Sequence, residues 1–302
     1  MSLTSIIIPT HSRPDLLTRS VKSALASGTN VEVIVVDDAS ADETADVCAS
    51  LHGITYVRVE RNLQVAGARN KGLLASRGKY ISFLDDDDVR LPDTIDEQVD
   101  LLEKDDQATL VYGQALIADQ SDTLTGERYP MMCKEGDAFW SLLSQNFIPC
   151  GTAVFRRSCV NELGLLDDTI PGVDDWDFWV RMTAAHRIKV LEKPVMIWRQ
   201  STPRSKQGTS QAADIVSKAA NQFRRSWMKL PRAVSARAEV RKATWRRFST
   251  LLAAHLLYDT KNALQSGDIN RATKNCFAMG HLNPWAVLQL VRKRSRLRLL
   301  AQ

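Results

Sequence analysis

The first 113 residues alternate between short apolar runs and helical stretches, and this alternation limits the fold more than any other feature. The runs are rich in β-branched residues and lack strict polar alternation, which is typical of parallel strands covered on both faces. We expect strands at Ser5–Ile8, Val31–Val36, Tyr56–Val59, Tyr80–Leu84 and Thr109–Val111. We expect helices at Pro14–Ser27, Ala41–Leu51, Gly67–Ser76 and Pro92–Lys104, with Ser12 and Ser40 as N-caps of the first two. This order predicts an α/β fold, with a Rossmann-like, mostly parallel sheet flanked by helices.

Residues 114–210 are less regular. We expect a β-hairpin at Leu116–Tyr129 that turns at Thr125-Gly126, because glycine favours such turns. The remaining elements are predicted as helices at Gly136–Gln145 and Asp175–Ala185 and as strands at Ile188–Leu191 and Val195–Arg199.

Acidic residues follow two of the predicted strands, at the edge where ligands of such a sheet bind. Asp37-Asp38 ends the second strand, where an acid can accept hydrogen bonds from a ribose or a base. The run Asp85–Asp88 ends the fourth strand, and Mg²⁺ or Mn²⁺ held together with substrate phosphate would relieve the repulsion between its carboxylates. The alternatives are helix capping for the pair and a solvated turn for the run. No G-x-G-x-x-G follows the first strand, which argues against a dehydrogenase.

Two further segments carry charge in patterns that suit a ligand. In VERNLQVAGARNKGLLAS, Arg69 and Lys71 stand at a predicted helix start, where cations would cradle phosphate. In GVDDWDFWVRM, Asp174 and Asp175 precede Trp176. An acid beside an aromatic surface can have a raised pKa and act as a base, and an indole face suits a sugar ring. The alternatives are solvated helix charges, and an acidic helix N-terminus whose tryptophans fill the core.

Four segments together resemble glycosyltransferase family 2, whose members have the GT-A fold. They are SIIIPTHSRPDLLTRSVKSAL, EVIVVDDASADET, AGARNKGLLASRGKYISFLDDDD and GVDDWDFWVRM, and the match covers about residues 3–200. The resemblance implies a metal-dependent, inverting hexosyltransferase. Such an enzyme moves a sugar from a nucleotide diphosphate donor to a hydroxyl of a glycan or lipid-linked glycan. UDP is the commonest donor nucleotide by analogy, and GDP and dTDP sugars stay open.

The resemblance also assigns roles to residues. Nucleotide contacts are expected from Pro9, Thr10, His11, Arg13, Asp37, Asp38, Arg69, Asp85 and Asp86. The divalent cation, Mn²⁺ or Mg²⁺, is expected on Asp87 as direct ligand and on Asp85. The catalytic residues are expected to be the acidic pair Asp174-Asp175, with Asp175 as the base, and Asp174 stands where the family usually has Glu. Acceptor contacts are expected at Trp176 and Gly151, and a donor-covering loop at Arg199, Arg204 and Ser205.

Charge divides the chain into two regions. Residues 1–210 contain 22 Lys or Arg and 31 Asp or Glu, whereas residues 211–302 contain 18 and 4. We therefore expect a catalytic domain at 1–210 and a helical, basic region at 211–302. Within the domain, the nucleotide-binding half covers about 1–113 and the acceptor half about 114–210.

The end of the chain, PWAVLQLVRKRSRLRLLAQ, places apolar residues beside five Lys or Arg. One interpretation is a basic amphipathic helix on an anionic membrane surface. The other is a helical appendage that packs on the catalytic domain or mediates a homodimer. No recognition motif supports a nucleic-acid partner.

Cysteine usage and hydropathy bear on location. Five scattered cysteines without a CxxC pair predict buried reduced thiols and a cytoplasmic protein. If the C-terminal segment binds lipid, the protein is peripheral on the inner face of the membrane. No apolar run reaches the roughly 18 residues of a membrane span.

Two other functions fit the same fold class. A sugar nucleotidyltransferase shares the architecture, but it would need a glycine-rich phosphate loop after the first strand, and PTHSRPD has no glycine. A catalytically inactive homologue that serves as a binding subunit is the other alternative. The intact acidic motifs argue against it.

Overall fold

The structure is a computed structural model that describes residues 2–200, 212–282 and 285. The chain divides into an α/β unit, Met1–Ala138 with Phe147–Gln200, and a helical unit, Phe139–Asn146 with Ser201–Gln302. The boundary that we expect near residue 210 stays a prediction, because residues 201–211 lie outside the described part of the chain.

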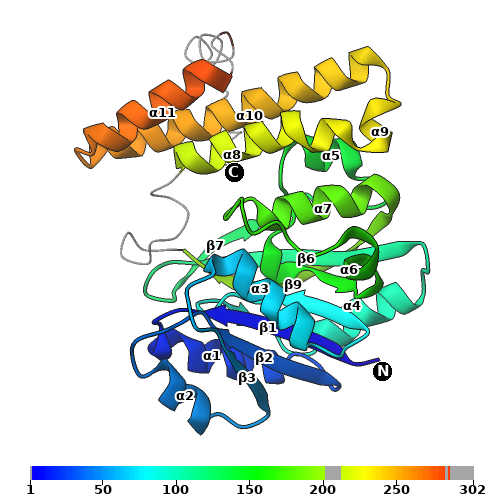
Figure 1. The fold of residues 1–302 in the computed structure, drawn as a ribbon, viewed down its shortest axis with the longest axis vertical. Coiled ribbons are helices and arrows are strands. Elements are labelled where there is room, and N and C mark those ends of the chain that lie inside the picture. The colour runs from blue at the N-terminus through cyan, green and yellow to red at the C-terminus, as the bar shows by residue number, and fades with distance from the viewer. Residues whose placement is uncertain (1, 201–211, 283–284, 286–302) are drawn as a thin grey trace. The chain divides into compact units, whose positions relative to one another are not determined.

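One sheet runs through the α/β unit (Figure 1). Its strands are β1 Thr4–Thr10, β2 Val31–Asp37, β3 Ile54–Arg58, β4 Tyr80–Phe83, β5 Val89–Arg90, β6 Ala108–Ala118, β7 Leu124–Tyr129, β8 Val154–Arg156 and β9 Arg187–Arg199. They follow the order β3-β2-β1-β4-β8-β6-β9-β5, and β7 pairs with β6. The first four strands are parallel to one another, whereas β8 is antiparallel to both β4 and β6. The predicted α/β fold is confirmed, and its sheet is parallel chiefly in the N-terminal half.

Helices pack on both faces of this sheet. They are α1 Pro14–Leu25, α2 Thr44–Ser50, α3 Gln64–Ala75, α4 Thr94–Glu103, α6 Ser158–Leu163 and α7 Asp174–Ala185. Ile6 and Ile8 of β1 share a buried cluster with Leu17 of α1. Ile7 points the other way, where a Cβ on Gly72 of α3 would come within 2.2 Å of it. Glycine at this position lets α3 approach β1 closely, and burial of each branched side chain contributes about 1.5–3 kcal/mol.

Some local predictions are wrong for identifiable reasons. α2 begins at Thr44, because the Ser40 hydroxyl accepts a hydrogen bond from the backbone of Ser12 and caps no helix. The hairpin turns at Asp119–Thr123, where the Asp119 carboxylate accepts from two backbone N–H groups ahead of it. The two short strands expected after residue 187 form the continuous strand β9, because both halves pair with β6.

The helical unit contains α5 Phe139–Ser144, α8 Ala212–Arg225, the 3₁₀ helix η4 Trp227–Lys229, α9 Pro231–Val234, α10 Ala238–Gln265 and α11 Ile269–Leu282. Phe223, Trp227 and Phe248 are buried, and the ring centres of Phe223 and Phe248 lie 4.6 Å apart. The predicted helical character holds for the described part of this region. The basic segment 286–302 lies outside it. Among the described helices, none has the length and apolar character needed to cross a bilayer.

Candidate active site

The carboxyl ends of three neighbouring strands bring the predicted polar residues to one edge of the sheet. Thr10 at the end of β1 is in register with Asp37 at the end of β2. The backbone N–H of Asp38 donates to the Thr10 carbonyl at 2.8 Å. On the other side of β1, β4 ends at Phe83, two residues before Asp85. The parallel pairing therefore gathers these groups as the sequence predicts.

Asp37 is fully buried, and both oxygens of its carboxylate accept hydrogen bonds from other residues of the protein. One of its carboxylate oxygens accepts from the Ser40 backbone at 2.8 Å, and the other accepts from the Tyr56 hydroxyl at 2.6 Å. Burial acts to raise the pKa of Asp37, but these hydrogen bonds outweigh it and hold the pKa below its ordinary value. Asp37 thus stabilises the turn that follows β2.

Asp38 has a different environment from its neighbour. Its carboxylate accepts a hydrogen bond from the Leu63 backbone at 2.6 Å, and burial raises its pKa above the ordinary value. Nδ1 of His11 donates to the Asp38 carbonyl at 2.7 Å, which ties the segment after β1 to the segment after β2. Of this acidic pair, Asp38 keeps more capacity to accept from a ligand.

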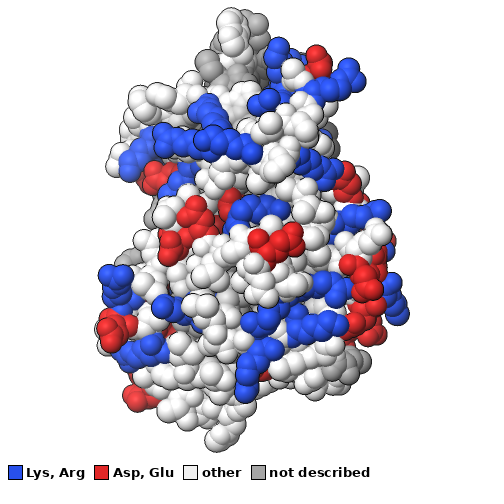
Figure 2. Space-filling model, turned by 45° about the vertical axis from the view of Figure 1, so that its right-hand side comes forward, with Lys and Arg blue, Asp and Glu red and all other residues white. Residues whose placement is uncertain are grey.

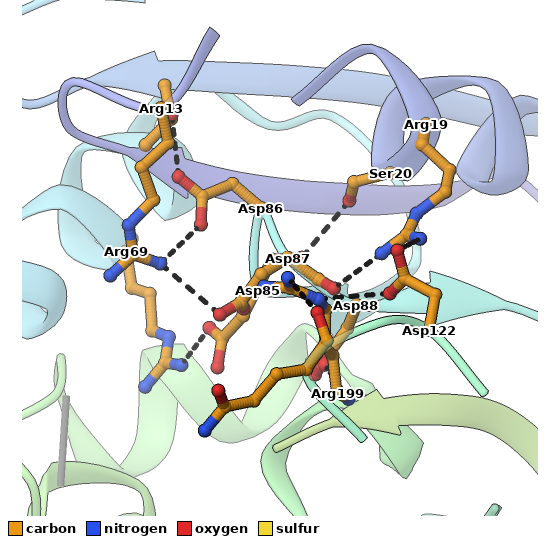
Figure 3. A network of polar contacts seen from close by, with 12 residues as sticks. Arg13, Arg19, Ser20, Arg69, Asp85, Asp86, Asp87, Asp88, Asp122 and Arg199 are labelled. Atoms are coloured by element: carbon orange, nitrogen blue, oxygen red, sulfur yellow. Dashed lines mark hydrogen bonds and ion pairs between the residues drawn. The ribbon is translucent and has the colours of Figure 1, made fainter. Parts of the chain in front are cut away.

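Arginines surround the acidic run Asp85–Asp88, as Figure 3 shows. Asp86 is buried and accepts from the Thr10 hydroxyl at 2.7 Å and from Arg13 at 3.0 Å. The same Arg13 guanidinium lies 3.4 Å from an oxygen of Asp87. Predicted nucleotide-binding residues from two strand ends are thus brought into direct contact.

Asp87 and Asp85 suit a hard divalent cation. Burial raises the pKa of Asp87 to about 7, and the negative charges of Asp85 and Asp86 add to the rise. A cation would relieve this crowding. Within the described residues, no group of three or more His, Cys, Asp or Glu side chains is arranged to hold a metal ion. Mg²⁺ and Mn²⁺ often take one or two protein carboxylates and complete their coordination with substrate phosphates, so the pair fits.

Arg69 joins the acidic run to the acids of α7. It lies in the second turn of α3, not at the helix start that the sequence suggests, because α3 begins at Gln64. Its guanidinium is almost fully buried and lies 2.7 Å from Asp85 and 3.0 Å from Asp174. The Arg69 guanidinium thus connects the two predicted halves of the catalytic domain.

The two acids at the start of α7 differ in what they contact. Asp174 is buried, and its oxygens accept from Arg69 and from the backbone of Gly172 at 3.0 Å. Asp175 accepts from the backbone N–H of Trp176 at 2.6 Å. Burial raises the pKa of Asp175 to about 7, and the charge of Asp174 adds to the rise. Asp174 acts as an anchor, and Asp175 is able to exchange a proton near neutral pH.

The residues expected to contact the acceptor, Trp176 and Gly151, are buried. Trp176 is 6% exposed. Gly151 lies in the buried 3₁₀ helix η1 Cys150–Thr152, where a Cβ would meet Met196 and where its carbonyl accepts from Arg90. Their acceptor roles stay predictions. Cys150, which sequence reasoning did not place in the site, lies close enough to Arg69 for that charge to influence its pKa, which burial raises.

The residues predicted for a donor-covering loop are only partly described. Arg199 ends β9, and its backbone N–H donates to the Asp88 carboxylate at 3.0 Å. Its guanidinium donates to the Gln120 carbonyl at 2.6 Å. Arg204 and Ser205 lie outside the described residues.

Asp122 is a site residue that sequence reasoning missed. Its carboxylate lies 2.6 Å from Arg19 and 3.0 Å from Arg199, and Arg19 donates to the Asp87 carbonyl at 3.1 Å (Figure 3). Through these two arginines Asp122 reaches both Asp87 and Asp88. No local pattern marks it, because its partners lie on α1 and β9.

Residues 5–164 match the family model described as Glycosyl transferase family 2, and the chain belongs to that family. An uncharacterized glycosyltransferase of Rickettsia prowazekii (strain Madrid E) is 32% identical over 186 residues, covering 59% of this chain and 58% of that protein. The UDP-Glc:alpha-D-GlcNAc-diphosphoundecaprenol beta-1,3-glucosyltransferase WfaP of Escherichia coli is 36% identical over 106 residues, covering 34% of this chain and 42% of that protein. The chain thus spans less than two thirds of the length of these relatives.

Solved structures share the fold. TarS of S. aureus in complex with UDP-GlcNAc superposes with a TM-score of 0.58 at 14% identity, over 90% of this chain and 89% of that chain. The mannosyltransferase PcManGT of Pyrobaculum calidifontis, in complex with GDP-Man and Mn²⁺, has a TM-score of 0.55 at 19% identity. The match covers 99% of this chain and 85% of that chain. The expected GT-A fold is confirmed by these neighbours.

If the acidic run holds Mn²⁺ together with a nucleoside diphosphate, replacement of Asp122 by Asn should raise the Mn²⁺ concentration needed for that binding several-fold. The substitution removes the charge that holds Arg19 and Arg199 beside the acidic run. Both ion pairs are partly exposed, so the loss should cost stability only about 0.2–1 kcal/mol each. Thermal-shift titration with Mn²⁺ measures both effects. Asp106→Asn, on a residue whose side chain is 97% exposed, is the matched control, and an equal response of both variants would refute the positioning role.

Proposed function

We propose that this chain is a metal-dependent, inverting glycosyltransferase that moves a sugar from a nucleotide diphosphate donor to an acceptor hydroxyl. The observation that carries the proposal is the double ion pair of Arg69. It joins Asp85 of the acidic run to Asp174, the neighbour of Asp175. One edge of the sheet therefore carries a group suited to a cation and diphosphate together with a carboxylate suited to accept a proton.

The donor side is formed by the segments after β1, β2 and β4. Asp38 would accept hydrogen bonds from the base or ribose, with Thr10 and His11 bordering the nucleotide. Asp87 and Asp85 would hold Mn²⁺ or Mg²⁺, which, when bound, neutralises charge on the departing diphosphate. Arg13 keeps Asp86 and Asp87 oriented from one side through its contacts at 3.0 and 3.4 Å.

Asp175 would act as the catalytic base. It takes the proton of the acceptor hydroxyl while that oxygen forms a bond to the anomeric carbon, and the bond from this carbon to the diphosphate oxygen breaks. One displacement from the opposite face inverts the configuration. A pKa of about 7 suits this task, because a base works best when its pKa lies near the operating pH.

The comparisons support a UDP-sugar donor and a lipid-linked glycan acceptor without settling either. TarS is solved with UDP-GlcNAc, and WfaP is named for transfer from UDP-Glc to a GlcNAc-diphosphoundecaprenol. PcManGT is solved with GDP-Man and Mn²⁺, so a GDP sugar is the alternative donor. A thermal-shift screen of UDP, GDP and dTDP sugars with Mn²⁺ tests the choice, since a ligand that binds the folded state raises apparent stability.

Asp175→Asn should lower the rate of sugar transfer by about 10²–10⁴-fold, which is the usual contribution of a general base. Nucleotide affinity should stay nearly unchanged, because Asp174 and Arg69 keep their contact. Release of nucleoside diphosphate reports turnover, and titration calorimetry reports affinity. An equal loss of both would show that Asp175 is structural.

Asp87→Ala should abolish the Mn²⁺-dependent part of nucleotide binding, because it removes the proposed direct ligand. The apparent unfolding temperature without ligand should not fall, since the change relieves repulsion within the acidic run. Asp100→Ala, on an exposed residue of α4, serves as the control. Retained Mn²⁺ dependence in Asp87→Ala would remove the metal assignment.

Turnover at saturating Mn²⁺ and donor should rise with pH, with its midpoint below about 7. Only the deprotonated form of Asp175 accepts a proton, and a cation on Asp85 would offset one of the charges that raise the pKa of Asp175 to about 7. Saturating metal keeps Asp87 deprotonated, so the profile reports Asp175. The residual activity of Asp175→Asn should not change with pH, and a rise of the same shape in that variant would contradict the assignment.

A further inference from the structure

A dense basic surface lies on the helical unit. Eight exposed cations from α8, η4 and α10 and the segment before α10 form it, namely Arg224, Arg225, Lys229, Arg237, Arg241, Lys242, Arg246 and Arg247. Glu239 is the one acidic residue between positions 224 and 247. Figure 2 shows Lys and Arg side chains gathered on the upper part of the molecule, which is the helical unit.

The aromatic core of the unit holds these cations close together. Phe223 near the end of α8 lies 5.1 Å from Trp245 and 4.6 Å from Phe248 of α10, measured between ring centres. The Arg224 guanidinium stacks on the Trp245 ring at 4.6 Å. The basic end of α8 is therefore packed against the basic first half of α10.

Within residues 2–200 and 212–282, most of these charges have no anionic partner. Arg237 lies 3.8 Å from Glu239. In the part of the chain that the structure describes, Arg225, Lys242, Arg246 and Arg247 make no ion pair with an acidic side chain. Such a concentration of like charge is unfavourable by itself, and it favours a partner that presents many negative groups at once.

Two exposed aliphatic side chains come from the same stretch of sequence as the cations. Val234 of α9 is 58% exposed, and Val240 of α10 is 38% exposed. Cations interleaved with exposed aliphatic groups suit the headgroup region of a bilayer, where the charges meet lipid phosphates and the apolar groups meet acyl chains. We propose that this basic surface binds an anionic lipid bilayer.

Two other occupants fit the surface less well. A symmetric dimer through it would place each cation opposite cations of a second copy, which is repulsive. A nucleic acid would match the charge. However, Trp227 is buried and Arg224 stacks on the Trp245 ring, so the surface offers little aromatic area on which the bases of a single strand could stack. The proposal concerns binding only and does not depend on the transferase reaction.

Flotation of the full chain with vesicles tests the proposal. The protein should float with phosphatidylcholine vesicles that contain phosphatidylglycerol, and it should not float with phosphatidylcholine alone. Because each basic residue near an anionic surface contributes a factor of about five to partitioning, the triple variant Lys242→Gln, Arg246→Gln, Arg247→Gln should bind on the order of 100-fold more weakly. NaCl at about 1 M should release the wild-type protein, because the screening length falls to about 3 Å.

The matched control removes the same charge from the α/β unit. Lys22, Lys104 and Arg187 are exposed, and their triple replacement by Gln should leave flotation unchanged. Equal loss in both triple variants, or no loss in either, would overturn the basic surface as the binding site. Equal flotation with uncharged vesicles would overturn the electrostatic mechanism. Displacement from anionic vesicles by an equal concentration of a duplex oligonucleotide would assign the surface to nucleic acid instead.

A second readout separates this proposal from the proposed reaction. Donor binding, measured by thermal shift with UDP and Mn²⁺, should be the same in both triple variants and in the wild-type protein. A failure of every variant to bind nucleotide would count against the transferase, whereas the vesicle result would still decide on lipid binding. Loss of nucleotide binding in the Lys242, Arg246 and Arg247 variant alone would show that the surface serves the site rather than a membrane.

Discussion

The rest of the candidate site depends on the Arg69 guanidinium, which is buried between Asp85 and Asp174. Removing one partner of such a buried arrangement typically costs about 3–5 kcal/mol, because a charge is left without compensation. One cation here serves two carboxylates, and a third, Asp175, stands beside them. The remaining negative charge, together with burial, accounts for the raised pKa of Asp175. The contact that joins the two halves of the unit therefore also adjusts the proton affinity of the proposed base.

In two pairs of adjacent acids, Asp37-Asp38 and Asp174-Asp175, one member stabilises the fold and the other is placed to contact a ligand. Asp37 is occupied by Ser40 and Tyr56, whereas Asp38 keeps acceptor capacity. The Asp174 carboxylate likewise accepts from Arg69, and the adjacent Asp175 accepts from the backbone N–H of Trp176. In both pairs the more deeply anchored acid orients the one that would meet the ligand. This is a physical reason for carboxylates to occur in adjacent pairs at the site.

Much of the fold was predictable, because strand periodicity and the acids after β2 and β4 are local properties of the sequence. The contacts that organise the site were not. Ser40 looks like a helix cap, and only the approach of β1 gives its hydroxyl another donor. Asp122 lies in an ordinary turn, and its arginines come from residues 19 and 199. Arg90 is buried against Gln98 and the Gly151 carbonyl, an arrangement that no spacing rule reveals.

The position of β6 within the sheet has a consequence for biosynthesis. β6 pairs with β7, β8 and β9, all of which follow it in the chain, and β8 also covers the outer edge of β4. The first four strands can pair as soon as they leave the ribosome, but β4 then presents an open edge until residues 154–156 arrive. The nascent chain should be most vulnerable to aggregation during this interval. A chaperone that shields the β4 edge would be most useful at that stage of translation.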